Sequence, residues 1–216
     1  MSASPSFEEE YFRSNYPDYA RQNPPKKLRF YRELAERACR GIERPRVLEL
    51  GCGFGLFLEA LGPRWERFGT DLSAYALEHA QRAVPAASLK REGATERSFE
   101  GTFDLVAAFD VLEHVPDLER TGAMVGDALE PGGHLVFVVP VYDGPTGPAV
   151  HLLDRDPTHV HKKGRGFWLD WASARFRIVA WCGIYRLLLP GGFYVHRTTH
   201  LLRRMTPAIA VVARKA

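Results

Sequence analysis

The stretch VLELGCGFG, residues 47–55, decides the fold of this chain. Its first four residues are mainly apolar and predict a short strand, and its three alternating glycines predict a tight turn. An apolar helix is expected to follow at residues 56–61. Glycine lets the backbone of such a turn approach a ligand closely, and the free N–H groups of the helix start point to the same place. The sequence therefore predicts a ligand site between this strand and this helix.

Strands and helices continue to alternate after this turn. Apolar segments predict strands and amphipathic segments predict helices, with strands at 65–70, 87–91, 103–109 and 134–139, and helices at 73–83 and 117–129. This alternation is typical of βαβ units and a parallel sheet. The strands at 103–109 and 134–139 are nearly continuous apolar runs, as expected where helices cover both faces of a sheet. The fold class is therefore α/β.

The chain divides into an N-terminal helical extension, residues 1–44, and one larger domain, residues 45–216. The extension carries a helix at 26–40 and several aromatic residues before it. Two of them, Tyr11 and Tyr16, either cover the ligand site as a lid or pack on the body of the domain.

The last third of the chain holds two irregular segments. Residues 141–166 are rich in Pro, Gly, His and Asp, and a long segment of this kind in a compact domain is typically functional. An aromatic and basic insert at about 185–205 separates two further expected strands, at 177–182 and 208–213. We expect the segment at 141–166 to be the part that contacts the second substrate.

Composition narrows the class of protein. With 216 residues, 45% hydrophobic and 25% charged, the chain is neither disordered, collagen-like nor a disulfide scaffold. Three widely separated cysteines suit a reducing compartment. The start of the chain is acidic rather than apolar, and the longest apolar runs are far too short to span a membrane. We expect a cytoplasmic protein without a signal peptide or transmembrane segment.

Charge is distributed unevenly. Residues 45–140 hold eight basic and fifteen acidic residues, whereas residues 141–216 hold twelve basic and four acidic ones. This asymmetry suggests an anionic partner for the C-terminal part, or simply a solvated basic face. Arg186, Arg197, Arg203 and Arg204 are candidates for binding a carboxylate or phosphate, or for peripheral contact with a membrane beside residues 187–189.

An acidic residue completes the predicted ligand site. Asp71 ends the second strand, twenty residues after Gly51, where a carboxylate can accept the hydroxyl hydrogens of a ribose. Dinucleotide binding would require a third glycine at position 56, which is Leu. A nucleoside with a charged amino-acid tail therefore fits better than NAD, although a glycine turn without a ligand is the alternative.

Several segments together resemble one family. Residues 47–55, the Gly69-Thr70-Asp71 segment, the fourth-strand segments 103–106 and 110–115, and the turn at 129–135 resemble the motifs of class I S-adenosylmethionine-dependent methyltransferases, in the family's order and spacing. The resemblance covers residues 47–140 and implies S-adenosylmethionine as cofactor. It also implies a Rossmann-like, doubly wound, mostly parallel seven-stranded sheet with helices on both faces and an antiparallel last strand.

The resemblance also implies residue roles. The methionine end would lie against Glu49, Gly51 and Gly53, the ribose would be held by Asp71, and Leu72 would flank the adenine. The remaining expected cofactor residues are Cys52, Gly55, Ala94, Phe109 and Asp110. Many family members have an Asp where this chain has Ala94, so a backbone group of Ala94 or Thr95 is expected to replace that contact.

Two histidines are candidates for the catalytic base. Imidazole has a pKa near neutrality, and both His114 and His159 follow strands whose carboxyl ends face the ligand crevice. The segment Asp156-Pro157-Thr158-His159-Val160 is similar to an acceptor loop of small-molecule members. His151, His159, His161 and Asp154 are conceivable metal ligands, but no paired motif supports such a site and no metal is expected.

These observations predict methyl transfer to a small-molecule acceptor, at oxygen, with an anionic or amphipathic acceptor favoured. The C-terminal aromatics, Trp168, Trp171, Phe176, Trp181, Tyr185, Phe193 and Tyr194, either line an apolar acceptor pocket or belong to the core. The alternative is an RNA methyltransferase, suggested by the basic C-terminal part, although no nucleic-acid partner is expected. Further alternatives are a nicotinamide-dependent reductase and a non-catalytic cofactor-binding module. The oligomeric state does not follow from the sequence.

Overall fold

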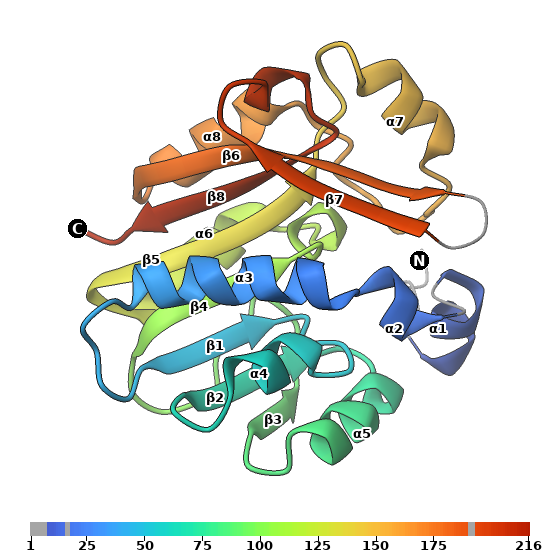
Figure 1. Cartoon of the computed structure of the whole chain (residues 1–216). Coiled ribbons are helices and arrows are strands. Elements are labelled where there is room, and N and C mark those ends of the chain that lie inside the picture. The colour runs from blue at the N-terminus through green and yellow to red at the C-terminus, as the bar shows by residue number, and fades with distance from the viewer. Residues whose placement is uncertain (1–7, 16–17, 190–192) are drawn as a thin grey trace.

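A computed structural model describes residues 8–15, 18–189 and 193–216. Its elements follow one another as shown in Figure 1: α1 (Glu9–Asn15), α2 (Tyr19–Gln22), α3 (Pro25–Ala38), β1 (Arg46–Leu50), α4 (Leu56–Leu61), β2 (Glu66–Asp71), α5 (Ala74–Ala83), β3 (Ser88–Arg91), β4 (Phe103–Phe109), η1 (Leu112–His114), α6 (Leu118–Ala128), β5 (Leu129–Pro140), α7 (Gly147–Leu153), α8 (Arg165–Ser173), β6 (Arg177–Leu189), β7 (Phe193–Thr199), η2 (Arg203–Met205) and β8 (Ala208–Arg214).

One mixed sheet organises the described residues, with the strand order β3-β2-β1-β4-β5-β8-β6-β7. Strands β1 to β5 are parallel to one another, whereas β8 runs antiparallel to both β5 and β6. This confirms the expected α/β, Rossmann-like, doubly wound fold with helices on both faces. The sheet has eight strands in the described residues rather than seven, because β7 pairs antiparallel with β6 at the edge.

The extra strand lies in the insert that the sequence placed at about 185–205. Strand β6 does not end at Cys182 but continues to Leu189, and β7 returns along it. Residues 190–192, Pro-Gly-Gly, form a turn signal between two runs rich in aromatic and aliphatic residues, and this hairpin pattern was overlooked. These three residues lie outside the described part, as do the side chains of Leu187–Leu189, Phe193 and Tyr194.

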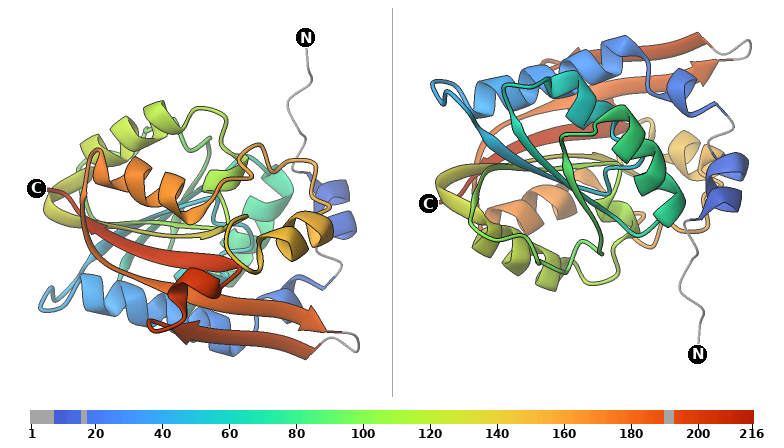
Figure 2. Two further views of the ribbon diagram at one scale, coloured as in Figure 1. Left: turned by 90° about the horizontal axis from the view of Figure 1, so that it is seen from above. Right: turned by 90° about the horizontal axis from the view of Figure 1, so that it is seen from below.

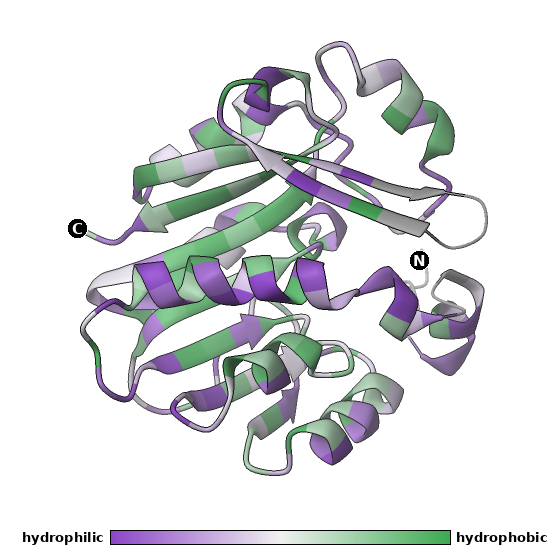
Figure 3. Ribbon diagram, in the orientation of Figure 1, coloured by the Kyte–Doolittle hydropathy of each residue, from purple (hydrophilic) through white to green (hydrophobic). Residues whose placement is uncertain are grey.

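Helices cover both faces of the sheet, as the two views of Figure 2 show. Helices α3, α4 and α5 lie on one face, and α6 and α8 lie on the other. Successive side chains of β1 point to opposite faces of the sheet. Val47 packs on the face covered by α3, α4 and α5, whereas Leu48 and Leu50 pack on the face covered by α6 and α8. The apolar residues concentrate on the central strands in Figure 3, which is why these strands read as continuous apolar runs.

The order in which successive strands are added to the sheet reverses between β1 and β4, which are parallel neighbours. A doubly wound sheet opens a crevice at this point, at the carboxyl ends of its strands. Gly51 follows β1 with φ of 63°, and a Cβ there would lie 2.4 Å from Val111 Cγ2. Only glycine satisfies both the positive φ and this close approach. At the start of α5, the Ser73 hydroxyl accepts a hydrogen bond from Ala76 N at 3.0 Å, as expected of an N-cap.

The N-terminal helices α1 and α2 lie beside the carboxyl ends of the central strands, as Figure 1 shows. Tyr11 contacts the acceptor-side segment, since its hydroxyl donates to Asp156 Oδ2 at 3.0 Å. Tyr16, the other aromatic expected in a lid, lies outside the described residues. In the described part of the chain, no helix is long and apolar enough to cross a membrane.

Candidate active site

A cavity of about 410 Å³ opens at the carboxyl ends of β1, β2 and β4. Most residues expected to hold the cofactor line this cavity: Glu49, Gly51, Cys52, Gly53, Asp71, Leu72, Ala94, Phe109 and Asp110. His114 also lines it. Gly55 does not, and a Cβ at that position would instead lie 3.1 Å from Ala80 Cα. The third glycine of the turn therefore permits close packing of α4 against α5 rather than contact with a ligand.

The carboxylate of Asp71 is held in place by the glycine turn itself. Gly53 N donates to Asp71 Oδ2 at 2.9 Å, and Ser73 N donates to Asp71 Oδ1 at 2.9 Å. Burial raises the pKa of Asp71, and these backbone hydrogen bonds act against that rise. The side chain is thus fixed on the cavity wall where a ribose would be recognised.

Glu49 reaches the same cavity from β1. Burial, and secondarily the charge of Asp71, raises its pKa well above the usual range. Among the described residues its Oε2 atom has no hydrogen-bond partner, although the atom is buried. A buried polar atom without a partner is costly unless a ligand satisfies it, so Glu49 fits an ammonium group bound beside it.

Two positive side chains converge on Asp110, which adopts φ of 59° just after β4. Lys27 Nζ of α3 lies 3.3 Å from Asp110 Oδ2, and Arg186 of β6 pairs with Asp110 Oδ1. Burial acts to raise the pKa of Asp110, but the charges of Arg186 and Lys27 outweigh it and hold the pKa below its usual range. Burial lowers the pKa of Lys27, and Asp110 acts against that fall.

Tyr11, named from the sequence as a lid residue, lines the cavity, but Lys27 does so as well and was not predicted. Lys27 precedes Tyr31 and Leu34 on the buried face of α3, at four- and seven-residue spacing. A lysine on an otherwise apolar helix stripe was the available signal. Tyr19 was a further missed contact, because its ring lies 4.1 Å from the Phe54 ring and its hydroxyl lies 3.5 Å from Phe54 N.

His159 belongs to a hydrogen-bonded network in the segment between α7 and α8. Its Nδ1 atom lies 2.9 Å from Asp154 Oδ1 and 3.1 Å from the Tyr142 hydroxyl, and Lys162 Nζ lies 3.0 Å from Asp154 Oδ2. Burial acts to raise the pKa of Asp154. Hydrogen bonds from Tyr142, His159 and Lys162 outweigh this effect and keep the pKa below its usual range. An ionised carboxylate only accepts hydrogen bonds, so His159 Nδ1 carries the proton and Nε2 carries the lone pair.

His114 lies beside His159, with the ring centroids 4.6 Å apart. Burial, together with the nearby His159, lowers the pKa of His114 to about 4. Its Nδ1 atom lies 2.8 Å from the Thr158 hydroxyl, which in turn donates to Asp156 Oδ1 at 2.5 Å. His114 thus stands on the wall of the cofactor cavity, with the ring of His159 packed beside it.

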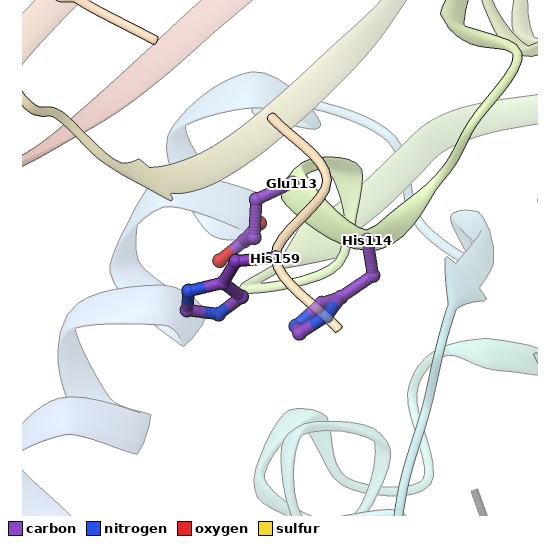
Figure 4. Close-up of side chains that lie close together, drawn as sticks. All are labelled: Glu113, His114 and His159. Atoms are coloured by element: carbon purple, nitrogen blue, oxygen red, sulfur yellow. The ribbon is translucent and has the colours of Figure 1, made fainter. Parts of the chain in front are cut away.

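Glu113 adds a third group to the two histidines, as Figure 4 shows. Candidate ligand atoms of Glu113, His114 and His159 all lie within 4.8 Å of one another. Burial, and then the charge of Asp110, raises the pKa of Glu113 well above its usual range. A neutral carboxylic acid can donate one hydrogen bond, so this cluster suits proton handling as well as ligation.

The metal set weighed from the sequence does not come together in the described residues. His161 Nε2 is hydrogen-bonded to the Val115 carbonyl oxygen at 2.9 Å, and the ring of His151 lies 4.8 Å from that of Tyr142. Of these three histidine side chains, that of His159 is the one that the structure places against the side chains of Asp154, Glu113 and His114.

Four of the C-terminal aromatics belong to the core, the second of the two places that the sequence allowed for them. Trp168 and Phe176 are buried in the core under α6 and α8, and Trp171 and Trp181 pack against it. Of the candidate arginines, Arg186 reaches the site, whereas the Arg203 guanidinium lies 4.1 Å from the centre of the Trp181 ring.

Comparison with known proteins places this geometry in a family. A family model described as a methyltransferase domain matches residues 19–182. The chain is 35% identical over 106 residues to a ubiquinone biosynthesis O-methyltransferase of Alkalilimnicola ehrlichii, an alignment that covers 45% of this chain and 42% of that protein. The chain therefore spans less than half the length of this curated relative in the alignment.

Solved structures share the fold over nearly the whole chain. A SAM-dependent methyltransferase from Thermotoga maritima superposes with a TM-score of 0.69 at 16% identity, covering 96% of this chain and 99% of that one. The N-methyltransferase NodS from Bradyrhizobium japonicum WM9, in complex with S-adenosyl-L-homocysteine, superposes with a TM-score of 0.62 at 18% identity, covering 89% of each chain.

The glycine turn, the fixed Asp71 and the partnerless Glu49 oxygen suit a nucleoside that carries an amino-acid tail, and S-adenosylmethionine is the cofactor. With the family match extending over residues 19–182, the chain belongs to the class I S-adenosylmethionine-dependent methyltransferases and is an enzyme of that family.

Proposed function

We propose that this enzyme transfers a methyl group to an oxygen atom of a small-molecule acceptor by in-line displacement. The observation that carries the proposal is the Asp154–His159 pair, in which His159 Nδ1 lies 2.9 Å from Asp154 Oδ1. A histidine backed by a carboxylate is a suitable general base for a hydroxyl, whereas an amine need only lose its proton before attack.

The cofactor residues have separate tasks in this proposal. Glu49, Gly51, Cys52 and Gly53 hold the methionine end, with Phe109 and Asp110 at its edge. Asp71 accepts hydrogen bonds from the ribose, while Leu72 and Ala94 flank the adenine. When bound, S-adenosylmethionine supplies a methyl group on a positively charged sulfur. The remaining task of the protein is to align the acceptor and to remove its proton.

His159 removes that proton through Nε2, the ring atom opposite the one bound to Asp154. The imidazolium that forms is stabilised by the ionised Asp154 carboxylate, to which Tyr142 also donates at 2.6 Å. His114, neutral and on the cavity wall, is a second hydrogen-bonding group for the acceptor. Its low pKa makes His114 a weak base.

Two further observations support this type of acceptor: one concerns the attacked atom, and the other concerns the charge of the acceptor. The curated relative described above carries the name of an O-methyltransferase of ubiquinone biosynthesis. The Lys27–Asp110–Arg186 group has two positive charges for one negative, which favours an anionic acceptor group near it. RNA methylation is the second reading, supported only by the net positive charge of residues 141–216.

The N-terminal extension, residues 1–44, acts as a lid in this proposal. Tyr11, Phe12 and Tyr19 line the cavity, and Phe12 stacks on Phe54 of the glycine turn with the rings 5.1 Å apart. The larger domain, residues 45–216, then supplies the cofactor site and the acceptor segment 141–166. A cytoplasmic location agrees with three free, buried cysteines.

The experiment is a transfer assay with radiolabelled S-adenosylmethionine against phenols, quinols, hydroxy acids, amines and RNA. We expect label in a hydroxyl compound and none in RNA. Label confined to amines would overturn the oxygen assignment. Methylation of RNA with an affinity that falls steeply with salt would establish the nucleic-acid reading instead.

A further inference from the structure

A continuous series of hydrogen bonds runs from the N-terminal helix α1 to a histidine of the cavity wall. The Tyr11 hydroxyl donates to Asp156 Oδ2 at 3.0 Å. The other oxygen of the same carboxylate, Oδ1, accepts from the Thr158 hydroxyl at 2.5 Å. The Thr158 oxygen in turn lies 2.8 Å from His114 Nδ1.

The direction of the last hydrogen bond follows from the first two. Asp156 is ionised, because hydrogen bonds led by that of Thr158 outweigh the effect of burial and lower its pKa. An ionised carboxylate only accepts, so the single hydroxyl hydrogen of Thr158 is committed to Asp156. The Thr158 oxygen is then an acceptor toward His114, and the hydrogen between them must reside on His114 Nδ1.

The surroundings make this arrangement well defined. Thr158 is buried, and its backbone N–H donates to Asp156 Oδ1 at 2.9 Å, so the side chain and backbone of one residue are tied to the same carboxylate. His114 is neutral near pH 7, since burial lowers its pKa to about 4. A neutral imidazole has one protonated nitrogen, and the partner of Nδ1 decides which one it is.

We propose that Thr158, Asp156 and Tyr11 are positioning residues that hold His114, a residue of the cavity wall, as its Nδ1–H tautomer, which leaves the lone pair on Nε2. We call the series Tyr11–Asp156–Thr158–His114 the relay. Its consequence, that Nε2 accepts a hydrogen bond from the methyl acceptor, rests on the proposed function. Its first link lies in the N-terminal extension, so the docking of α1 on the acceptor segment and the state of His114 are coupled.

Each of the two histidines is oriented by a carboxylate, one directly and the other through a hydroxyl group. His159 is oriented directly by Asp154, whereas His114 is oriented by Asp156 through the hydroxyl of Thr158. Both carboxylates come from the same short segment, and Asp156 N donates to Asp154 Oδ1 at 3.1 Å. The segment is therefore a single support for both imidazoles.

The test is the tautomer of His114, read from the 15N chemical shifts of the full chain labelled with 15N-histidine near pH 7. His114→Gln identifies the signal. We expect the Nδ1–H tautomer in the unmodified enzyme and in Thr158→Ser, which keeps the hydroxyl. Thr158→Val keeps the shape but removes the acceptor, so most of His114 should shift to the Nε2–H tautomer. An Nε2–H signal in the unmodified enzyme, or no change in Thr158→Val, would overturn the relay.

Turnover provides the second measurement. Thr158→Val should lower kcat about 10-fold with an unchanged KM for S-adenosylmethionine, since one hydrogen bond to the acceptor is lost. Thr158→Ser should restore most of that rate, and equal losses in both variants would show a packing role and contradict the proposal. Tyr11→Phe keeps the ring and should shift part of the His114 population. An unchanged spectrum there would remove α1 from the relay.

These results separate the relay from the proposed function. The tautomer is measured without an acceptor, so a wrong acceptor assignment leaves the spectrum unaffected. Conversely, if His114 proves to be Nε2–H while His159→Ala still abolishes turnover, the relay is wrong and the assignment of the base stands.

Discussion

The nucleoside side and the acceptor side of this site are built in different ways. The nucleoside side comes from one continuous stretch, in which β1, the glycine turn, α4 and β2 bring Glu49, Gly53 and Asp71 together. The acceptor side adjoins Asp110, the residue at the edge of the methionine end, and draws Lys27, the 154–159 segment and Arg186 from distant parts of the chain.

The two halves of the site hold their key side chains in position by different kinds of hydrogen bond. On the nucleoside side, backbone N–H groups hold the key carboxylate, so the geometry follows from a turn that only glycine can make. On the acceptor side, charged and hydroxyl side chains hold one another. Substitutions should therefore affect cofactor affinity in the first half and turnover in the second.

The largest effect is expected on the acceptor side, from His159→Ala. Loss of a general base should lower kcat about 10²–10⁴-fold. The dissociation constant for S-adenosylmethionine, measured by calorimetry, should barely change, because His159 is not among the residues that line the cofactor cavity. His114→Ala is the matched comparison. If His114→Ala abolishes turnover while His159→Ala preserves it, the base is His114.

The corresponding change on the nucleoside side is Asp71→Ala. Removing hydrogen bonds to a charged group should weaken S-adenosylmethionine binding by about 1.5–3 kcal/mol, or about 10- to 150-fold in the dissociation constant. Calorimetry checks this directly, and kcat at saturating cofactor should change little. If Asp71→Ala binds S-adenosylmethionine normally but has a low kcat, Asp71 acts in turnover rather than in cofactor binding, which would contradict the division of the site into two halves.

Acidification should destabilise the fold through its buried histidines, among them His196 of β7. Burial, followed by the charges of Lys27 and Arg186, lowers the pKa of His196 to about 4, against about 6.5 in an unfolded chain. Between these values the unfolded chain binds a proton that the folded chain does not. The free energy of unfolding should therefore fall with decreasing pH, by up to about 1.4 kcal/mol per pH unit for each such histidine.

Urea unfolding of His196→Asn between pH 7 and 4.5 measures this contribution. The free energy of unfolding should depend less steeply on pH in this variant, by up to about 1.4 kcal/mol per pH unit. The variant retains His114, whose lowered pKa makes a similar contribution. His200→Asn, a surface substitution, is the control. An unchanged slope in His196→Asn would show that its protonation is not linked to folding.

The smallest effect is expected from chelators. Turnover should be unchanged in EDTA, because the proposed proton transfer requires only side chains. A loss of turnover that an added divalent cation restores would instead assign Glu113, His114 and His159 to a metal ion, and would remove His159 as the base.

Residues 47–140 by themselves determined the fold and the cofactor. The strand, glycine turn, helix and Asp71 obey local rules of backbone conformation and hydrophobic periodicity, and these rules can be read from neighbouring residues. For the same reason, Phe103–Phe109 was predicted with its observed bounds. The eighth strand was missed only because the hairpin of β6 and β7 was read as an irregular insert.

Tertiary structure alone decided the acceptor side. No spacing in the sequence relates Lys27 to Asp110, 83 residues away, or Tyr11 to Asp156, 145 residues away. The sequence singled out His114 and His159, but not that Thr158 and Asp154 would determine which nitrogen of each carries the proton. Such contacts arise where the carboxyl ends of β4 and β5 meet α1 and α3, and their partners are chosen by packing rather than by order along the chain.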